Sequence, residues 1–271
     1  MTEAKQQSRL YEALRDAVKA GRPVALATVI EGPPATLGAK LLVGPGLPPA
    51  GGLGDDDLDR VVARDSLGEL EAGRSGTRHY GPRGEARQQD LSVFIESFAP
   101  PPHLVIFGAV DFTAALLRVA KFLGYRVTVC DARAVFATRQ RFPLADEVVV
   151  DWPNRYLEKV GPELGARDAV CVLTHDAKFD VPALVSALAT GAGYIGAMGS
   201  RRTHAARVER LRAAGVSDGD LARVMSPIGL DLGARTPEET AISICAEIIA
   251  LRTGRHPPSL RDAAGPVHGG A

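Results

Sequence analysis

HLVIFGAVDFT (residues 103–113) and YRVTVCDAR (residues 125–133) are the two stretches of this chain that decide its fold. The first holds a short apolar run that stops at Gly108, followed by apolar residues at helical spacing over residues 113–122. The second holds another apolar run, which stops at Asp131. Strands that are apolar throughout are buried on both faces, so the pattern predicts the first βαβ unit of a Rossmann-like, doubly wound parallel sheet in an α/β protein.

The turn after the first strand departs from the usual dinucleotide fingerprint. Asp131 lies 23 positions after Gly108, close to the spacing at which a carboxylate meets a ribose hydroxyl. In Gly-x-Gly-x-x-Gly, however, the second and third positions are glycine, whereas here they are Val110 and Thr113. Asp111 adds a negative charge where a phosphate would sit at the helix N-terminus. We therefore expect the fold without ordinary NAD binding, and keep an NAD(P)-dependent oxidoreductase as the alternative.

Composition excludes several classes of partner. The chain has 271 residues, with 32 Lys and Arg against 32 Asp and Glu. This balance gives no basic excess for nucleic acid and no polybasic arm for an anionic membrane. No run approaches the ~18 consecutive apolar residues of a membrane span, and the polar N-terminus lacks the apolar core of a signal peptide. A cytoplasmic location is expected.

The first part of the chain predicts a smaller α+β domain over residues 1–99. We expect helices at 10–18 and 55–71 and strands at 23–30, 38–43 and 91–98. Residues 47–54 are rich in Pro and Gly and are expected to be irregular, and residues 74–90 are expected to form a loop or weak hairpin. Three consecutive prolines at residues 100–102 suit a stiff hinge between two domains.

The second predicted domain, residues 100–254, alternates strands and helices. We expect further strands near 147–150, 169–173, 194–196 and 223–225, and helices near 156, 181–189, 202–214 and 236–252. The last helix begins with Thr236-Pro-Glu-Glu, which supplies a cap, a proline at the first helical position and a glutamate at the third. Residues 255–271 are expected to be a disordered tail.

Ligands of open parallel sheets bind beyond the carboxyl ends of the strands, so the residues after each strand are the candidates. Thr-His175-Asp follows the strand predicted at 169–173. The His175 imidazole either moves protons or holds loop backbone groups together. In Gly199-Ser200-Arg201-Arg, the glycine allows a ligand to approach the backbone, the serine can cap a helix, and the two arginines supply positive charge. This pattern favours an anion-binding site over a capped helix with two solvated arginines. Gly229 and Gly233 describe a tight loop around Asp231. The residues that we expect to bind a ligand are Gly108, Asp131, His175, Gly199, Ser200 and Arg201.

No metal site or catalytic residue is expected. The three cysteines lie far apart, without Cys-x-x-Cys spacing, inside predicted strands or a helix, and are interpreted as buried apolar residues. The other histidines singled out form no metal-ligand spacing; they are His79, His103, His204 and His256. No nucleophile elbow or Gly-Lys-Ser phosphate loop occurs.

Several of these segments resemble the XdhC/CoxI family. The resemblance rests on PPPHLVIFGA, VCDAR, LTHD, YIGAMGSRR and PIGLDLGARTPEETA, which together cover nearly all of residues 100–254. Residues 23–43 are similar to the smaller domain of the family more loosely. The resemblance implies a non-catalytic maturation protein that binds the molybdenum cofactor or a nucleotide. It would deliver this group to the apo-enzyme of a molybdenum hydroxylase such as xanthine dehydrogenase or carbon monoxide dehydrogenase, as a homodimer.

Two departures from the family pattern bear on the ligand. The family's Ser-Gly-Gly-Cys-Val-Glu segment corresponds to residues 51–58, which contain no cysteine, and its Gly-Ala-Gly turn is Gly108-Ala109-Val110 here. A thiolate, the usual soft ligand for molybdenum or sulfur, is therefore missing from that segment. A cofactor-free relative and an interaction protein with an unused crevice remain alternatives, since doubly wound sheets host many functions.

Overall fold

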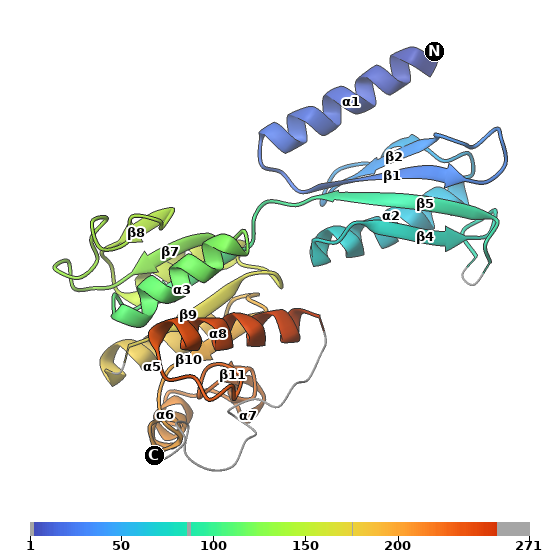
Figure 1. The fold of residues 1–271 in the computed structure, drawn as a ribbon. Helices are drawn as coiled ribbons and strands as arrows, with labels where there is room; N and C mark the ends of the chain where they lie inside the picture. Colours follow the sequence, from blue (N-terminus) through green and yellow to red (C-terminus); the bar gives the residue numbers. More distant parts are fainter. Residues whose placement is uncertain (1–2, 86–87, 175, 254–271) are drawn as a thin grey trace. The chain divides into compact units, whose positions relative to one another are not determined.

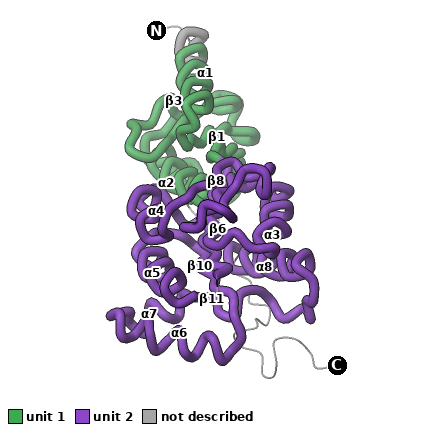
Figure 2. Tube along the Cα trace, turned by 90° about the vertical axis from the view of Figure 1, so that its left-hand side faces the viewer, with its two compact units in different colours: residues 1–100 green, residues 101–271 purple. Residues whose placement is uncertain are grey.

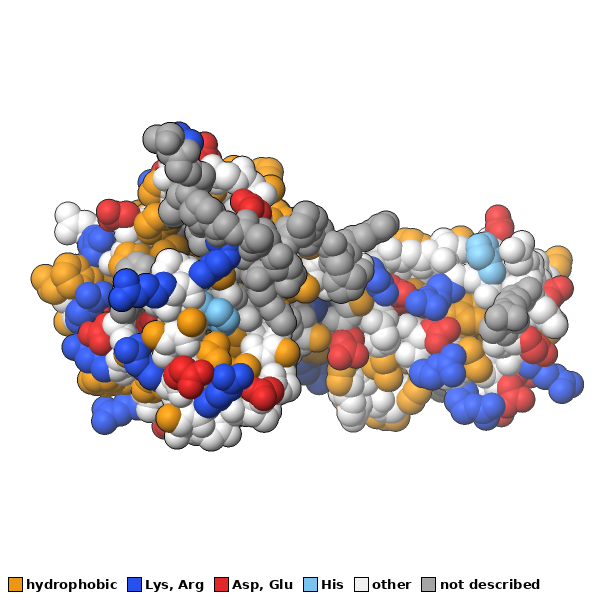
Figure 3. All heavy atoms as spheres, turned by 90° about the horizontal axis from the view of Figure 1, so that it is seen from below, with side chains coloured by type: hydrophobic (Ala, Val, Ile, Leu, Met, Phe, Trp, Pro, Cys, Tyr) orange, Lys and Arg blue, Asp and Glu red, His pale blue; other side chains and the backbone are white. Residues whose placement is uncertain are grey.

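The computed structural model describes residues 3–85, 88–174 and 176–253. The chain divides into two compact units, residues 1–100 and 101–271, which Figure 2 shows in green and purple. No helix within the described ranges is long and apolar enough to cross a membrane. On the face shown in Figure 3, basic and acidic side chains lie interspersed.

Unit 1 is an antiparallel sheet of order β3-β2-β1-β5-β4. Its elements are α1 (Glu3–Lys19), β1 (Val24–Glu31), β2 (Lys40–Val43), β3 (Ala50–Gly52), α2 (Asp56–Ala72), β4 (Gly76–Tyr80) and β5 (Leu91–Phe98). Alternate residues of β1 enter two separate apolar clusters: Ala25 and Ala27 pack with α2, and Val24 and Leu26 pack with α1. The two helices therefore cover opposite faces of the sheet (Figure 1).

Two segments of unit 1 differ from the sequence-based prediction. The expectation that residues 47–54 are irregular is wrong, because Ala50–Gly52 forms β3 on the edge of the sheet beside β2. Gly51 has φ +94°, and a Cβ on it would lie 2.2 Å from the Lys40 carbonyl oxygen. Glycine thus allows two backbones to come together where a side chain would block the pairing. The prediction of a loop or weak hairpin at residues 74–90 is correct in part: β4 lies in this range, but its partner is β5, the strand predicted at 91–98.

Unit 2 contains a six-stranded sheet in which every pairing is parallel, of order β11-β10-β9-β6-β7-β8. The strands are β6 (His103–Phe107), β7 (Arg126–Cys130), β8 (Glu147–Val149), β9 (Ala169–Val172), β10 (Tyr194–Ala197) and β11 (Val224–Met225). Counted along the unit, this is the order three-two-one-four-five-six, with the switch point between β6 and β9. The predicted doubly wound parallel sheet is confirmed.

Helices cover both faces of this sheet, as Figure 1 shows. They are α3 (Asp111–Phe122), α4 (Pro153–Val160), the 3₁₀ turn η1 (Gly161–Glu163), α5 (Ala177–Leu188), α6 (Arg201–Ala213), α7 (Asp218–Leu221) and α8 (Pro237–Arg252). Leu104 and Ile106 of β6 pack in one apolar cluster with α3 and α8, and Val105 and Phe107 pack in another with α4, α5 and α6. Burial on both sides explains why the strands are apolar throughout.

The ends of α8 follow the sequence prediction. Thr236 caps the helix by accepting from the Glu239 N–H at 3.2 Å, while the Glu239 carboxylate accepts from the Thr236 N–H at 3.1 Å. The short helix α7 was not predicted: Ser217 caps it, but four residues make too little periodicity to recognise. The tail predicted for residues 255–271 lies outside the described residues.

Candidate functional site

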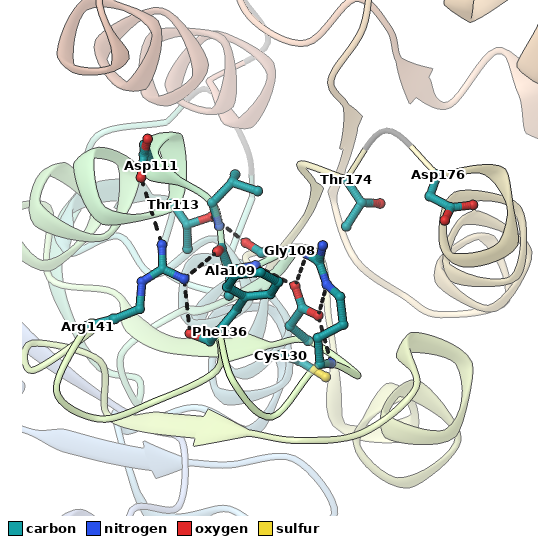
Figure 4. Close-up of polar contacts among 12 residues, drawn as sticks. Gly108, Ala109, Asp111, Thr113, Cys130, Phe136, Arg141, Thr174 and Asp176 are labelled. Carbon is teal, nitrogen blue, oxygen red and sulfur yellow. Dashed lines mark hydrogen bonds and ion pairs between the residues drawn. The ribbon is translucent and has the colours of Figure 1, made fainter.

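The turn after β6 lies at the switch point of the parallel sheet. Gly108 has φ +109°, and a Cβ on it would lie 2.8 Å from Thr174 Cγ2 and 3.1 Å from the Thr174 nitrogen. Thr174 follows β9, the neighbour of β6, so the two loops touch at this point (Figure 4). Both the backbone conformation and the close approach require glycine here.

The backbone N–H groups of this turn are engaged within the protein. The Ala109 N–H donates to Asp131 Oδ2 at 2.8 Å, and the Val110 N–H donates to Thr113 Oγ1 at 3.4 Å. The Thr113 hydroxyl in turn donates to the Gly108 carbonyl. A diphosphate in a Rossmann site binds such N–H groups, and in this turn a ligand would have to displace these internal hydrogen bonds.

Asp131 is used by the same turn. Its residue is 4% exposed, and besides the Ala109 N–H its carboxylate accepts from the Arg133 N–H at 2.9 Å and from the Arg133 guanidinium at 2.7 and 2.9 Å. Burial by itself would raise the pKa of Asp131, but the hydrogen bonds from Arg133 and Ala109 together hold that pKa below its usual value. Asp131 is therefore an ionised, internally paired carboxylate.

Arg141 is a neighbour of this turn that sequence analysis missed. Its guanidinium donates to the Ala109 carbonyl at 3.1 Å and lies 3.8 Å from the Asp111 carboxylate (Figure 4). The same group lies over the Phe136 ring, 5.6 Å from its centroid, and Arg133 lies over that ring at 4.6 Å. The negative charge of Asp111 is thus accompanied by a cation. Only the fold brings Arg141 to the turn, so no local sequence signal could have found it.

A cavity of about 260 Å³ opens beyond the carboxyl ends of β10 and β11, beside the first turn of α3. Four segments line it: the first turn of α3, the residues after β10, the loop after β11 and the N-terminal half of α8. The lining residues are Phe112, Met198, Gly199, Ser200, Pro227, Ile228, Leu230, Asp231, Leu232, Gly233, Ala234, Thr240 and Ser243. A largely apolar hollow with a few polar groups beyond the strand ends is typical of a small-molecule site.

Two of the predicted ligand-binding residues meet at this cavity. Gly199 has φ +147°, and Ser200 is the N-cap of α6, with its Oγ accepting from the Thr203 N–H at 3.2 Å. The predicted helix cap is therefore present. Arg201 is the first residue of α6 and is not part of the cavity lining. His175 lies outside the described residues.

A buried ion pair holds the loops around this cavity. Arg207 of α6 and Asp180 of α5 are 2% and 4% exposed, with 3.0 Å between Arg207 Nη2 and Asp180 Oδ2. Arg207 also donates to Ser226 Oγ at 3.0 Å and to the Met198 carbonyl at 2.7 Å, and the Thr174 hydroxyl donates to Asp180. One network thus ties together the ends of β9, β10 and β11. Nothing in the local sequence pattern pairs these two helical residues.

The thiols of unit 2 are unsuited to metal ligation. Burial raises the pKa of Cys130 and of Cys245 to about 12, and raises that of Cys171 well above its ordinary value. The prediction that the cysteines are buried is confirmed. In unit 1, the segment at residues 51–58 that corresponds to the family's cysteine motif contains no cysteine; its Leu53 is fully buried in the apolar core. Over the described ranges, no group of three or more His, Cys, Asp or Glu side chains could hold a metal ion.

Comparison with protein families gives two matches along the chain. Residues 104–248 match the XdhC Rossmann domain, and residues 17–81 match the XdhC and CoxI family. This chain belongs to the XdhC and CoxI family. The first match begins at the second residue of β6 and ends inside α8, so it contains the Gly108 turn and every segment that lines the cavity.

Two curated relatives of this XdhC/CoxI chain have informative names. It is 33% identical over 164 residues to a probable xanthine dehydrogenase subunit of Bacillus subtilis (strain 168), a match that covers 60% of this chain and 47% of the relative. It is 27% identical over 163 residues to the molybdenum cofactor insertion chaperone PaoD of Escherichia coli (strain K12), which covers 60% of this chain and 44% of the relative. The matches thus span less than half the length of these relatives.

A solved structure supports the fold of the XdhC/CoxI chain. A xanthine dehydrogenase from Bacillus halodurans aligns with a TM-score of 0.54 and 22% identity, covering 90% of this chain and 96% of that one. At this identity the likeness concerns the fold alone.

Proposed function

We propose that this XdhC/CoxI protein is an accessory protein of a molybdenum hydroxylase. It binds the molybdenum cofactor, or the pterin nucleotide part of it, and delivers this cargo to the apo-enzyme in the cytoplasm as a homodimer. Xanthine dehydrogenase and carbon monoxide dehydrogenase are the classes of partner that we propose. The names of the two curated relatives support a role beside molybdenum enzymes.

The observation that carries the proposal is the cavity bounded by Gly199, Ser200 and the loop after β11. It offers space for an organic ring, and the N-terminus of α6 at its edge favours an anionic substituent such as phosphate. The hydrogen bonds that engage Ala109, Val110 and Asp131 make the first turn a poorer seat for a diphosphate. The cavity therefore suits the pterin phosphate part of the cargo better than the first turn does.

The fit to the metal itself is different. The cysteines at the described positions are buried and their pKa values are raised, so they provide no thiolate at neutral pH. We propose that the chain grips its cargo through the organic part and leaves the molybdenum end for the acceptor enzyme. Gly108, Asp131, Gly199, Ser200 and Arg201, with His175, remain the residues proposed to act on the ligand side.

Cofactor retention and transfer test the proposal. The full chain is incubated with isolated molybdenum cofactor, the complex is separated by gel filtration with light scattering, and its molybdenum, pterin and mass are measured. It is then added to an apo-molybdenum hydroxylase. We expect retained cofactor, a dimer mass and restored hydroxylase activity. If the chain retains no cofactor and restores no hydroxylase activity, the cofactor role is refuted.

A matched pair of variants locates the anion site. Ser200→Asp keeps a good N-cap for α6 but places a negative charge at the cavity, whereas Ser200→Thr keeps the cap and stays neutral. We expect the first variant to lose cofactor retention and the second to keep it. Titration with NADH tests the oxidoreductase alternative: tight binding that Asp131→Ala abolishes would favour an NAD(P)-dependent enzyme.

A further inference from the structure

The loop after β11 is fixed to α8 by several backbone contacts. The Gly229 N–H donates to Glu247 Oε2 at 2.9 Å, and the Ser243 hydroxyl donates to the Leu230 carbonyl at 2.6 Å. The Leu230 N–H donates to the Ser243 carbonyl at 3.3 Å. Gly229 has φ +96°, and a Cβ on it would lie 2.5 Å from Ser243 Oγ. These hydrogen bonds and the close approach at Gly229 hold the loop against the helix.

Asp231 lies at the tip of this fixed loop. The Leu232 N–H donates to the Leu230 carbonyl at 2.9 Å, so the chain turns sharply around Asp231. Asp231 is an exposed residue that lines the cavity, and across the described part of the chain its carboxylate has no hydrogen-bond or ion-pair partner, so it is open to solvent and to a ligand. This differs from Asp131, Asp180 and Glu239, whose carboxylates all bind donors of the protein.

The walls of the cavity beside Asp231 are apolar and include one aromatic ring. Apolar side chains come from α3, from the end of β10 and from the loop itself: Phe112, Met198, Pro227, Ile228, Leu230 and Leu232. Such walls bind the faces of a flat ring, since a thioether and an aromatic side chain both pack well on π-systems. The carboxylate at the edge accepts hydrogen bonds and repels anions, so the ring edge that meets it must carry N–H donors.

We propose that the cavity binds a heteroaromatic ring whose edge carries an exocyclic amino group beside a ring N–H, with both donating to Asp231. Pterins and guanine share this edge, whereas adenine does not. A carboxylate that accepts two parallel N–H bonds gives both affinity and orientation. The ring then directs its phosphate substituent toward Ser200 and the N-terminus of α6. This inference rests on the proposed function, because it names the part of the cofactor that the same site recognises.

Pairs of ligands that differ in this edge test the inference. Pterin, lumazine, GMP and AMP are titrated into the full chain; in lumazine an oxygen replaces the exocyclic amino group of pterin. We expect pterin to bind at least about tenfold more tightly than lumazine, as for hydrogen bonds to a charged group. Asp231→Asn should reduce pterin affinity by about the same factor but should not weaken lumazine binding, because an amide can accept from the ring N–H and donate to the oxygen that replaces the amino group. The control, Asp218→Asn, changes an exposed carboxylate on α7 outside the cavity and should behave as wild type.

The outcomes separate the inference from the proposed function. Equal affinity for pterin and lumazine, unchanged pterin binding by Asp231→Asn, or no binding of any of the four probes would overturn the inference. If the cofactor is retained and transferred in these cases, the proposed function still stands. If GMP binds in an Asp231-dependent way and neither pterin nor the molybdenum cofactor binds, the recognised edge is correct, its source is a guanine nucleotide, and the cofactor role fails.

Discussion

The buried ion pair between Asp180 and Arg207 is the contact whose loss should matter most to unit 2. Replacing Arg207 by Met leaves a carboxylate that is 4% exposed without its cation, and it removes the donors to Ser226 and to the Met198 carbonyl. Breaking a buried pair in this way costs ~3 to 5 kcal/mol, a large part of the ~5 to 15 kcal/mol that stabilises a typical domain. We expect Arg207→Met to lower the free energy of unfolding by that amount.

Tryptophan fluorescence during urea unfolding measures this loss in unit 2 alone. The chain contains one tryptophan, Trp152, and it packs against Phe179 of α5 with the ring centroids 5.0 Å apart. Because Phe179 is the residue before Asp180, the signal reports the region of the ion pair. A double variant, Asp180→Leu with Arg207→Met, removes both charges, and its loss of stability should be smaller than the sum of the two single losses by a coupling of ~2 kcal/mol or more.

Arg212→Met is the control on the same helix. Arg212 pairs with Asp218 at 3.0 Å, but both side chains are more than half exposed, so its loss should change stability by less than ~0.5 kcal/mol. A loss below ~1 kcal/mol for Arg207→Met, or a double variant that loses the full sum of the single losses, would refute the claim that this pair holds the loops in place.

Three further predictions concern the turn after β6 and the thiols. Gly108→Ala should lower the free energy of unfolding by ~3 kcal/mol, because it strains the backbone and overlaps with Thr174 in the loop after β9. Gly124 has φ +81° with open space around it, so Gly124→Ala should lower the free energy of unfolding by only ~1 kcal/mol. Equal losses in the two variants would contradict the close approach at Gly108. Asp131→Asn should reduce stability at neutral pH. Because the folded pKa of Asp131 is lowered, its contribution is present above the unfolded pKa of about 4 and disappears as the pH falls through the folded value, so urea unfolding should show the difference from wild type shrinking below about pH 4. A thiol reagent at neutral pH should label none of the cysteines in the native protein and all three in urea, and fast native labelling would show that their burial is wrong; they are Cys130, Cys171 and Cys245.

Sequence analysis found the parallel sheet because each of its long strands carries its own signal. Leu104 to Phe107 is apolar at every position, and that pattern needs burial on both faces wherever the strand pairs. The edge strand β3 carries no such signal, because Ala50, Gly51 and Gly52 contribute backbone hydrogen bonds but no apolar side chain of note. A strand held mainly by its neighbour's backbone is visible only after the neighbour is placed.

The candidate site was predictable to the extent that it depends on spacing. Gly108, Asp131 and Ser200 could be singled out as candidates because a turn glycine, an acid at the next strand end and a helix cap occur at fixed distances along the chain, and their role in ligand binding stays a prediction. Arg141 and the pair of Asp180 with Arg207 were missed because long-range partners are brought together by the fold. The negative charge of Asp111 could be read from the sequence, but the Arg141 guanidinium beside it could not.

The carboxyl edge of this sheet offers a cavity beside a turn whose backbone N–H groups are already bonded within the protein. In a glycine-rich turn, unpaired backbone N–H groups bind a diphosphate. Here the Thr113 hydroxyl accepts from the Val110 N–H and donates to the Gly108 carbonyl. Asp131 takes a second N–H, so the turn satisfies its own backbone. Asp231 shows the opposite arrangement, because its loop is hydrogen-bonded to α8 at Gly229 and Leu230 while its exposed carboxylate has no partner among the described residues. A ligand gains more from an acceptor held ready than from donors it must first release, so recognition at this edge should shift from β6 to the loop after β11.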